Sequence, residues 1–200
     1  MILLSLPLLA LAILVRSTSP GSALFTQERV CARRLPARHP GEPERWELKT
    51  FTILKFRSMR ADASQLLHVQ HVALLTGGAA AGRQFKLVGD ARITPFGHWL
   101  RRLSLDELPQ LLNVLKGDMS LVGPRSLPVY EAVRLQPRHR LRFAARPGIT
   151  GLWQTSGRGS LSYEQMLELD VDYVQHRSVK GDVALLLRTP STVLRRTGAA

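Results

Sequence analysis

Two adjacent carboxylates, Asp106 and Glu107, form the part of this sequence best suited to chemistry. Between residues 91 and 150 the chain has ten Lys and Arg side chains but four acidic ones, and basic surroundings favour the ionised form of a carboxyl group. The pair also precedes a segment with a helical pattern, and helix N-terminal amides favour negative charge. Such a pair can bind Mg²⁺ through oxygen, or one member can act as a nucleophile that the other assists. Both roles suit a phosphorylated substrate, for which cations and a metal offset developing charge.

A structural role fits the same residues. Ser104 and Glu107 have the spacing of a capping box, in which the serine side chain caps a helix and the glutamate reaches back to the serine. Pro109 would then occupy a helical position where a backbone N–H is needed. A helix that starts nearer Asp106 accommodates Pro109 better, and the capping and catalytic roles are compatible.

Several basic residues could bind the phosphates of such a substrate. Lys55 and Arg57 have the two-residue spacing that places strand side chains on one side, so they form either a two-pronged anion site or a solvated strand edge. Arg125 follows Gly123 and Pro124 in a stiff turn, and an arginine held in this way is suited to phosphate.

A glycine-rich segment, residues 148–158, offers backbone amides, hydroxyl groups and Trp153 to a nucleotide or a sugar. The alternative is a packed loop with Trp153 in the core. We interpret His98 and Cys31 as structural residues.

The composition limits the classes of function. The 200 residues are 44% hydrophobic, which is enough for one domain with a core. With 28 Lys and Arg against 15 Asp and Glu, the net charge of +13 predicts anionic neighbours, namely nucleic acid, nucleotides or a membrane face. One cysteine excludes an internal disulfide and a multi-cysteine zinc site. Aromatic residues make up 6% of the chain and no groove-reading motif is present, which disfavours a nucleic-acid binder.

The N-terminal residues 1–15 are apolar except for Ser5. As a helix they would extend ~22 Å, less than the ~30 Å hydrocarbon core of a bilayer, so we do not expect them to span it. Pro7 should break or kink such a helix. The run is either a signal-peptide core, a segment that dips into one leaflet or lies at the interface, or a buried helix. Basic residues after it favour a cytoplasmic location for the rest of the chain.

The predicted elements place the carboxylates between strands and helices. Residues 46–56 alternate as a strand, and we expect this strand to pair with residues 24–30. Helical patterns cover residues 59–72, 96–102, 107–116, 129–143 with a break near Pro137, and 161–176. Segments 118–125 and 147–159 read as loops, and the apolar and basic tail 183–194 could lie on a membrane surface. In the central helix, the apolar face is expected to consist of Leu108, Leu111, Leu112 and Leu115, with Gly117 as the C-cap.

Taken together, these segments resemble the bacterial sugar transferases, which are monotopic polyprenyl-phosphate phosphoglycosyl transferases. The resemblance covers residues 6–198. It rests on the strings KFRSM (55–59), TPFG (94–97), RRLSLDELP (101–109) and LLNVLKGDMSLVGPR (111–125), and on segments 147–158 and 161–174. A run of this length is highly specific.

The resemblance implies an activity and the residues that perform it. Family members transfer a phosphosugar from a UDP-sugar to undecaprenyl phosphate or another polyprenyl phosphate and release UMP, which initiates exopolysaccharide or O-antigen synthesis. Asp106 would be the nucleophile that forms a phosphosugar intermediate, and Glu107 would assist it; both would bind Mg²⁺. The expected phosphate-binding residues are Lys55, Arg57, Arg101 and Arg125, and the expected nucleotide or sugar contacts are Gly123, Pro124, Gln154 and Arg158.

The resemblance also implies an α+β fold that is mainly helical, with a short β-hairpin, an N-terminal re-entrant membrane helix and amphipathic surface helices. We expect a shortened re-entrant segment at residues 1–16 and a phosphoglycosyl transferase domain at residues 17–200. That domain would lie on the cytoplasmic face of the inner membrane, with membrane lipids and downstream glycosyltransferases as partners.

Two positions and the length of the first helical leg depart from the family pattern. The family bends its membrane helix at a Ser-Pro pair after a full first leg, whereas here Leu6 precedes Pro7 and six residues precede the proline. Ser126 stands where proline is common, which should loosen the turn that holds Arg125. The alternatives are therefore a relative with a defective anchor, or a secreted or peripheral basic binding protein without catalysis.

Overall fold

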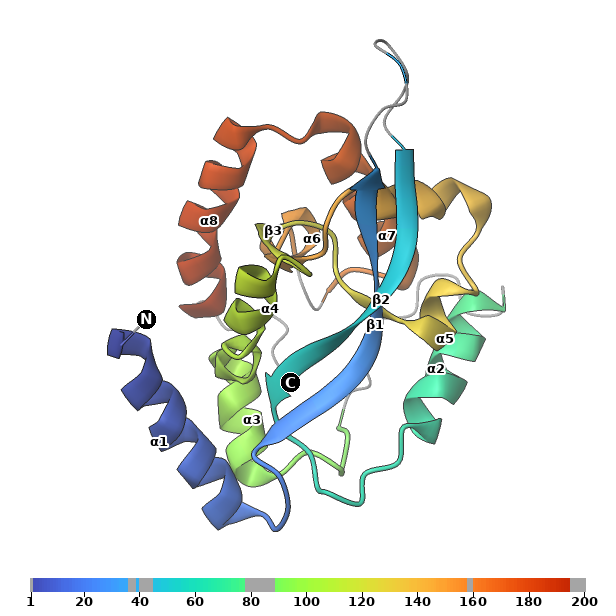
Figure 1. Ribbon diagram of the computed structural model, residues 1–200. Coiled ribbons are helices and arrows are strands. Elements are labelled where there is room, and N and C mark those ends of the chain that lie inside the picture. The colour runs from blue at the N-terminus through green and yellow to red at the C-terminus, as the bar shows by residue number, and fades with distance from the viewer. Residues whose placement is uncertain (1, 36–38, 40–44, 78–88, 158–159, 195–200) are drawn as a thin grey trace.

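The computed structural model describes residues 2–35, 39, 45–77, 89–157 and 160–194, which form a mixed structure of helices and strands (Figure 1). The α-helices are α1 (Ile2–Thr18), α2 (Leu66–Thr76), α3 (Pro95–Arg102), α4 (Gln110–Lys116), α5 (Val129–Ala132), α6 (Leu152–Thr155), α7 (Tyr163–His176) and α8 (Val179–Leu194). Two 3₁₀ helices are η1 (Leu105–Glu107) and η2 (Pro137–Ala144). The strands are β1 (Leu24–Leu35), β2 (Arg45–Phe56), β3 (Ser120–Val122), β4 (Leu127–Pro128) and β5 (Gly148–Thr150).

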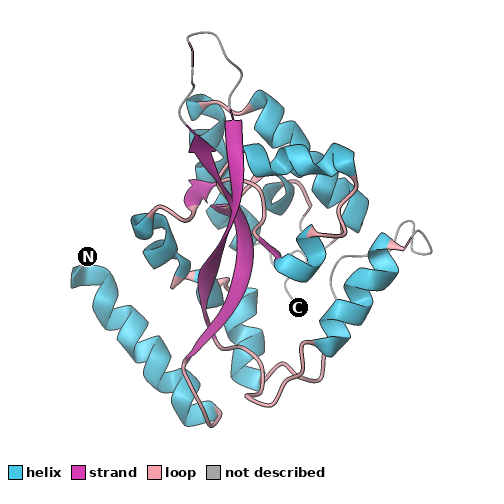
Figure 2. Ribbon diagram, turned by 45° about the vertical axis from the view of Figure 1, so that its right-hand side comes forward, coloured by secondary structure: helices cyan, strands magenta, loops and turns pink. Residues whose placement is uncertain are grey.

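A long antiparallel hairpin of β1 and β2 runs through the middle of the molecule, with helices on both sides (Figure 2). The register pairs Leu24 with Phe56 at one end and Leu35 with Arg45 at the other. Phe51 and Ile53 of β2 are buried, as the alternating pattern of a half-buried strand requires. The predicted strand and its partner are confirmed, and β4 adds a third strand beside β1.

Strands β3 and β5 form a short parallel pair in two segments that were predicted to be loops. The two backbones approach so closely that a Cβ on Gly123 would lie 2.3 Å from the carbonyl oxygen of Arg146. A Cβ on Gly148 would lie 2.1 Å from the amide nitrogen of Gly123. The loop prediction was wrong because strands of three residues are too short to show the alternation by which a strand is recognised.

Helix α1 is continuous through Pro7, so the predicted break does not occur. A proline in the second turn removes one backbone hydrogen bond, to the carbonyl of residue 3, and the rest of the helix can form around it. Leu11 and Val15 pack against Phe56 of β2 and Leu100 of α3, which ties α1 to the elements around the carboxylate pair. Within the described residues, no helix has both the length and the apolar character needed to cross a membrane.

Two of the predicted helices outside the centre of the chain have different bounds in the structure. The one expected at 59–72 is α2, which starts seven residues later, because Met59 forms a β-bridge with Ile93. The one expected at 129–143 divides into α5 and η2, on either side of a turn before Pro137. The helices expected at 96–102 and 161–176 are confirmed as α3 and α7. Helix α7 begins with a capping box made by Ser162 and Gln165.

The central helix is shorter than predicted, and its buried face is polar. Helix α4 starts at Gln110, and Gln110 and Asn113 are its buried residues. Of the predicted leucine face, Leu112 and Leu115 are exposed, whereas Leu108 packs against the cluster that contains Phe56 and Leu100. Gly117 has φ = 83° and forms the predicted left-handed C-cap.

Candidate functional site

The carboxylate pair lies in η1, a single turn between α3 and α4. The turn follows Ser104, which has φ = 55° in the left-handed region that non-glycine residues rarely adopt. The predicted capping box is wrong, because Ser104 has this conformation and makes no capping hydrogen bond with its side chain. Asp106 is buried, with 9% of its surface exposed, and Glu107 is partly exposed.

Asn113 fixes α4, and hence the adjoining turn, against β2. Its side-chain nitrogen donates to the carbonyl of Thr52 at 2.8 Å, and its side-chain oxygen accepts from the amide of Leu54 at 3.0 Å. The amide side chain thus pairs with the strand as a neighbouring strand would. Asn113 was not among the functional residues predicted from the sequence, although it lies within a leucine-rich helical pattern where a polar group needs a partner if it is buried.

Lys55 joins β2 to η1. Its ammonium group lies 2.8 Å from a carboxylate oxygen of Glu107, and both side chains are mostly buried. Since a close opposite charge offsets that of the glutamate, the ion pair lowers the repulsion that two adjacent carboxylates would exert on an anionic substrate.

Arg101 approaches the pair from the last turn of α3. Its Nε donates to the hydroxyl of Ser58 at 2.8 Å. Burial lowers the pKa of Arg101, and the nearby carboxylate of Asp106 opposes this shift. The structure therefore brings together Lys55, Arg101, Asp106 and Glu107.

Gly97 allows α3 to lie close enough for the Arg101 contact. A Cβ at this position would lie 1.9 Å from the backbone carbonyl oxygen of Ser58, so the two backbones would have to separate.

We expect Gly97→Ala to lower the free energy of unfolding by about 1–3 kcal/mol or more, because the added methyl group overpacks a contact between two backbones. The measurement is urea unfolding of the purified chain. Gly181→Ala is the matched control, since its Cβ would meet a movable side-chain hydroxyl at 3.1 Å. Equal midpoints for the two variants would contradict this account of Gly97.

Arg57 does not share a partner with Lys55. Its guanidinium donates to the carbonyls of Ser19 and Pro20, both at 2.6 Å, and so holds the turn that follows α1. The two basic residues therefore serve different contacts, and phosphate binding by Arg57 stays a prediction.

Arg125 is held through its backbone by two charged residues. Its amide donates to a carboxylate oxygen of Asp170 at 3.2 Å, and its carbonyl accepts from Arg142 at 2.8 Å. Asp170 and Arg142 also form an ion pair with each other, and their side chains are each 1% exposed. The guanidinium of Arg125 lies over the ring of Trp153, 5.7 Å from its centre.

This clamp compensates for the serine at position 126. Arg29 donates to the carbonyl of Ser126 at 2.9 Å, so both Arg125 and Ser126 are fixed by side chains from other elements. Burial lowers the pKa of Arg29 to about 10. Burial also raises the pKa of Glu131, which lies in the same cluster with Arg29 and Arg125 among its charged neighbours.

Asp170 and Arg142 were also not predicted from the sequence. The helical spacing of α7 could have identified Asp170, because this residue falls on the face of the helix that is buried. The buried residues of α7 are Tyr163, Met166, Leu167, Asp170 and Tyr173. An acidic residue at the core-facing positions of an amphipathic helix requires a buried partner. No local pattern identifies that partner as Arg142, which is 28 residues away in the chain.

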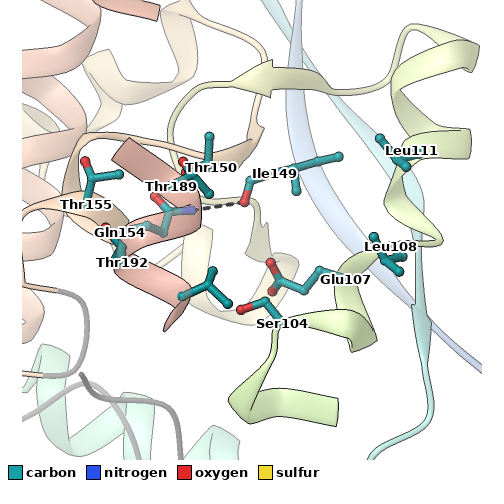
Figure 3. Close-up of a pocket in the computed structure, with 11 residues that line it drawn as sticks. Ser104, Glu107, Leu108, Leu111, Ile149, Thr150, Gln154, Thr155, Thr189 and Thr192 are labelled. Atoms are coloured by element: carbon teal, nitrogen blue, oxygen red, sulfur yellow. Dashed lines mark hydrogen bonds between the residues drawn. The ribbon is translucent and has the colours of Figure 1, made fainter. Parts of the chain in front are cut away.

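A pocket adjoins the carboxylate pair, between η1 and α4 on one side and β5, α6 and α8 on the other (Figure 3). Its volume is about 120 Å³. Glu107 and Ser104 face it from η1 and the preceding turn, and Gln154 faces it from α6. The described residues that line it are Ser104, Glu107, Leu108, Leu111, Ile149, Thr150, Gln154, Thr155, Thr189, Thr192 and Val193.

The other residues expected to contact the nucleotide or sugar are not among the described residues that line this pocket. Gly123 and Pro124 are buried at the end of β3, where the close approach of β5 accounts for the glycine. Trp153 is 3% exposed and belongs to the main hydrophobic core, as the structural alternative predicted, but it lies in helix α6 rather than in a loop. Arg158 lies outside the described residues.

Comparison with protein families matches residues 1–196 to the model described as bacterial sugar transferase. Among curated proteins, the UDP-galactose-lipid carrier transferase of Erwinia amylovora is 40% identical over 198 residues, which cover 99% of this chain and 39% of that protein. The undecaprenyl-phosphate galactose phosphotransferase of Salmonella typhimurium is 44% identical over 151 residues, which cover 76% of this chain and 32% of that protein.

A third relative is the UDP-glucose:undecaprenyl-phosphate glucose-1-phosphate transferase of Caulobacter vibrioides. It is 38% identical over 205 residues, which cover 96% of this chain and 65% of that protein. The chain therefore spans less than two thirds of the length of each of these three relatives. The family match extends over nearly every residue, including the carboxylate turn and its basic neighbours, and the chain belongs to the bacterial sugar transferase family.

Proposed function

We propose that this protein transfers a phosphosugar from a UDP-sugar to undecaprenyl phosphate or a related polyprenyl phosphate and releases UMP. The observation that carries the proposal is the turn η1, which holds Asp106 beside a Glu107–Lys55 ion pair, with Arg101 close to it. The names of the relatives support it, since they describe lipid-carrier or undecaprenyl-phosphate sugar transferases.

In the first step, a carboxylate oxygen of Asp106 attacks the phosphorus that bears the sugar. The bond from this phosphorus to the bridging oxygen breaks, and UMP leaves with the bond's electron pair. The product of this step is a phosphosugar on Asp106, and no proton has to move. A charged nucleophile can approach an anionic diphosphate only where cations offset the repulsion, and Lys55 and Arg101 supply such cations.

In the second step, a phosphate oxygen of the polyprenyl phosphate attacks the same phosphorus. The bond to Asp106 breaks, which restores the carboxylate and gives a polyprenyl diphosphate sugar. Such a product is the acceptor that a downstream glycosyltransferase would extend in exopolysaccharide or O-antigen synthesis. The experiment that tests the function is UMP release from a panel of UDP-sugars by membranes containing the chain, with undecaprenyl phosphate and Mg²⁺.

A membrane location follows from the lipid acceptor. Leu6, Leu9 and Ile13 of α1 are each more than half exposed, on the side away from α3. These side chains would contact lipid, and the net charge of +13 would favour an anionic cytoplasmic leaflet of the inner membrane.

The donor atoms of η1 fit Mg²⁺. Among the described residues, no group of three or more His, Cys, Asp or Glu side chains could hold a metal. Mg²⁺ is commonly bound by one or two carboxylates together with water and substrate phosphates, and Asp106 and Glu107 provide that number. When bound, the ion would neutralise charge on the phosphates.

Removal of divalent cations is expected to stop UMP release, because the phosphates would lose this neutralisation. The measurement compares the rate in excess EDTA with the rate in the same EDTA saturated with Mg²⁺. A full rate in excess EDTA would contradict the metal requirement.

A further inference from the structure

Four threonines face the pocket beside η1, and they come from three elements. They are Thr150 of β5, Thr155 of α6, and Thr189 and Thr192 of α8. Each brings a methyl group and a hydroxyl oxygen. The direction of each hydroxyl hydrogen decides what kind of ligand group the pocket can bind.

All four hydroxyl hydrogens have acceptors within the protein. Thr155 donates to the carbonyls of Gly151 and Leu152 at 3.2 and 3.0 Å. Thr192 donates to the carbonyl of Arg188 at 3.1 Å.

The remaining two threonines form a chain. Thr189 donates to the carbonyl of Leu185 at 2.8 Å, and its hydroxyl also lies 2.8 Å from that of Thr150. A hydroxyl has one hydrogen. Since Thr189 gives its hydrogen to Leu185, Thr150 must be the donor in the pair of threonines. Toward a ligand, these four threonines can therefore act only as hydrogen-bond acceptors, and they also contribute methyl groups.

The charge of the lining restricts the ligand further. Among the described residues of the lining, Glu107 is the one acidic residue, and it is paired with Lys55 at 2.8 Å. The same described residues include no Lys, Arg or aromatic side chain, so they offer a phosphate no cation and a nucleotide base no ring to stack on. Leu108, Leu111, Ile149 and Val193 complete the wall with aliphatic surface.

The largely aliphatic lining favours a ligand that presents C–H surface, and the four threonines favour one that also donates hydrogen bonds. Sugar rings do both, because hydroxyl groups at their edge alternate with C–H groups. Sites for drug-sized ligands occupy roughly 300–1,000 Å³, so a pocket of about 120 Å³ suits one group of a nucleotide sugar rather than the whole molecule.

We propose that this pocket holds the sugar ring of the donor, and that Thr189 and Thr192 of α8 help to determine which sugar is accepted. This inference rests on the proposed function. The position is chemically consistent, because Glu107 lines the pocket and is adjacent in sequence to the nucleophile Asp106. The sugar would lie against α8 while its phosphate faces η1.

Two substitutions of Thr192 test the placement. Thr192→Val keeps the shape but removes the acceptor oxygen, so kcat/KM for the preferred UDP-sugar should fall about 2- to 10-fold, the effect of one lost hydrogen bond. Thr192→Leu adds bulk to the pocket and should weaken binding of that UDP-sugar, while the affinity for UMP, which has no sugar on its phosphate, stays the same. Leucine is a better helix former than threonine, so α8 should persist.

The matched control is Thr76→Val. Thr76 donates to the carbonyl of Val72 at 2.9 Å in α2, the same type of bond as that of Thr192, but it does not line the pocket. This variant should match the wild type in kcat/KM and in affinity for both ligands.

Binding of UMP and UDP-sugars can be measured by calorimetry on detergent-solubilised protein, beside the turnover assay. A selective loss of UDP-sugar affinity in Thr192→Leu supports the placement. Equal losses for UMP and the UDP-sugar, or no loss for either, would overturn the placement while wild-type turnover keeps the proposed function. Absence of phosphosugar transfer by the wild type from every UDP-sugar in the panel would overturn the proposed function and this inference with it.

Discussion

Asp106→Asn should reduce UMP release by at least about 10⁴-fold, the scale seen when a catalytic nucleophile is removed. An amide has the shape of a carboxylate but lacks the charge and nucleophilicity needed to attack phosphorus. The substitution is nearly isosteric, so the effect should appear in kcat with little change in the free energy of unfolding. The measurement is UMP release from the preferred UDP-sugar, with urea unfolding of both proteins in parallel.

Asp118→Asn is the matched control for this experiment. Asp118 follows α4 and lies outside η1. Its substitution by asparagine removes the same charge from the same basic region. We expect its rate to be close to that of the wild type. UMP release by Asp106→Asn at the wild-type rate would refute the role of Asp106, and an equal loss in Asp118→Asn would indicate a general effect of charge.

Asp170→Ala should lower the free energy of unfolding by about 3–5 kcal/mol, because it leaves the guanidinium of Arg142 buried without its ionic partner. It also removes the acceptor for the backbone amide of Arg125. The measurement is the urea midpoint. If the unfolding slope is unchanged, the difference in midpoint reports stability directly.

An exposed ion pair provides the comparison. Glu164 pairs with Arg138 on the surface, where their side chains are 42% and 62% exposed. Glu164→Gln should cost less than about 1 kcal/mol, because water already solvates both groups.

A second variant separates the buried charge from the shape of the site. In the double variant Asp170→Leu with Arg142→Met, both charges of this buried pair are removed together, and much of the lost stability should return. If Asp170→Ala unfolded at the same urea concentration as Glu164→Gln, the clamp on Arg125 would not contribute to stability.

Local patterns were sufficient to predict much of the framework. The alternation in residues 46–56 predicted β2 and its pairing with β1, since a strand with one buried face leaves a period of two in the sequence. The helices α3 and α7 were predicted for similar reasons, because helix periodicity and caps depend on neighbours within a few residues. The concentration of Asp106, Glu107 and Arg101 in one short run identified the candidate centre.

Predictions failed where a residue's partner is far away in the chain. The serine at position 104 has the spacing of a cap, but the packing of α3, η1 and α4 forces it into a left-handed turn. The leucines of α4 have helical spacing, but the face that carries Gln110 and Asn113 is buried, because Asn113 pairs with the backbone of β2. Strands β3 and β5 could not be recognised because each exists only through the other.

The sequence by itself determined the hairpin, the helices α3 and α7, the candidate carboxylate pair and the family, since these depend on local spacing or on a long specific run of residues. Only the tertiary structure decided which side chains from other elements contact the carboxylate pair and its surroundings. It separated Lys55 from Arg57, clamped Arg125 between Asp170 and Arg142, and brought α8 threonines to a pocket beside Glu107. The physical reason is that a buried charge or hydroxyl must find a partner wherever the folded chain provides one, and spacing along the sequence carries no record of that choice.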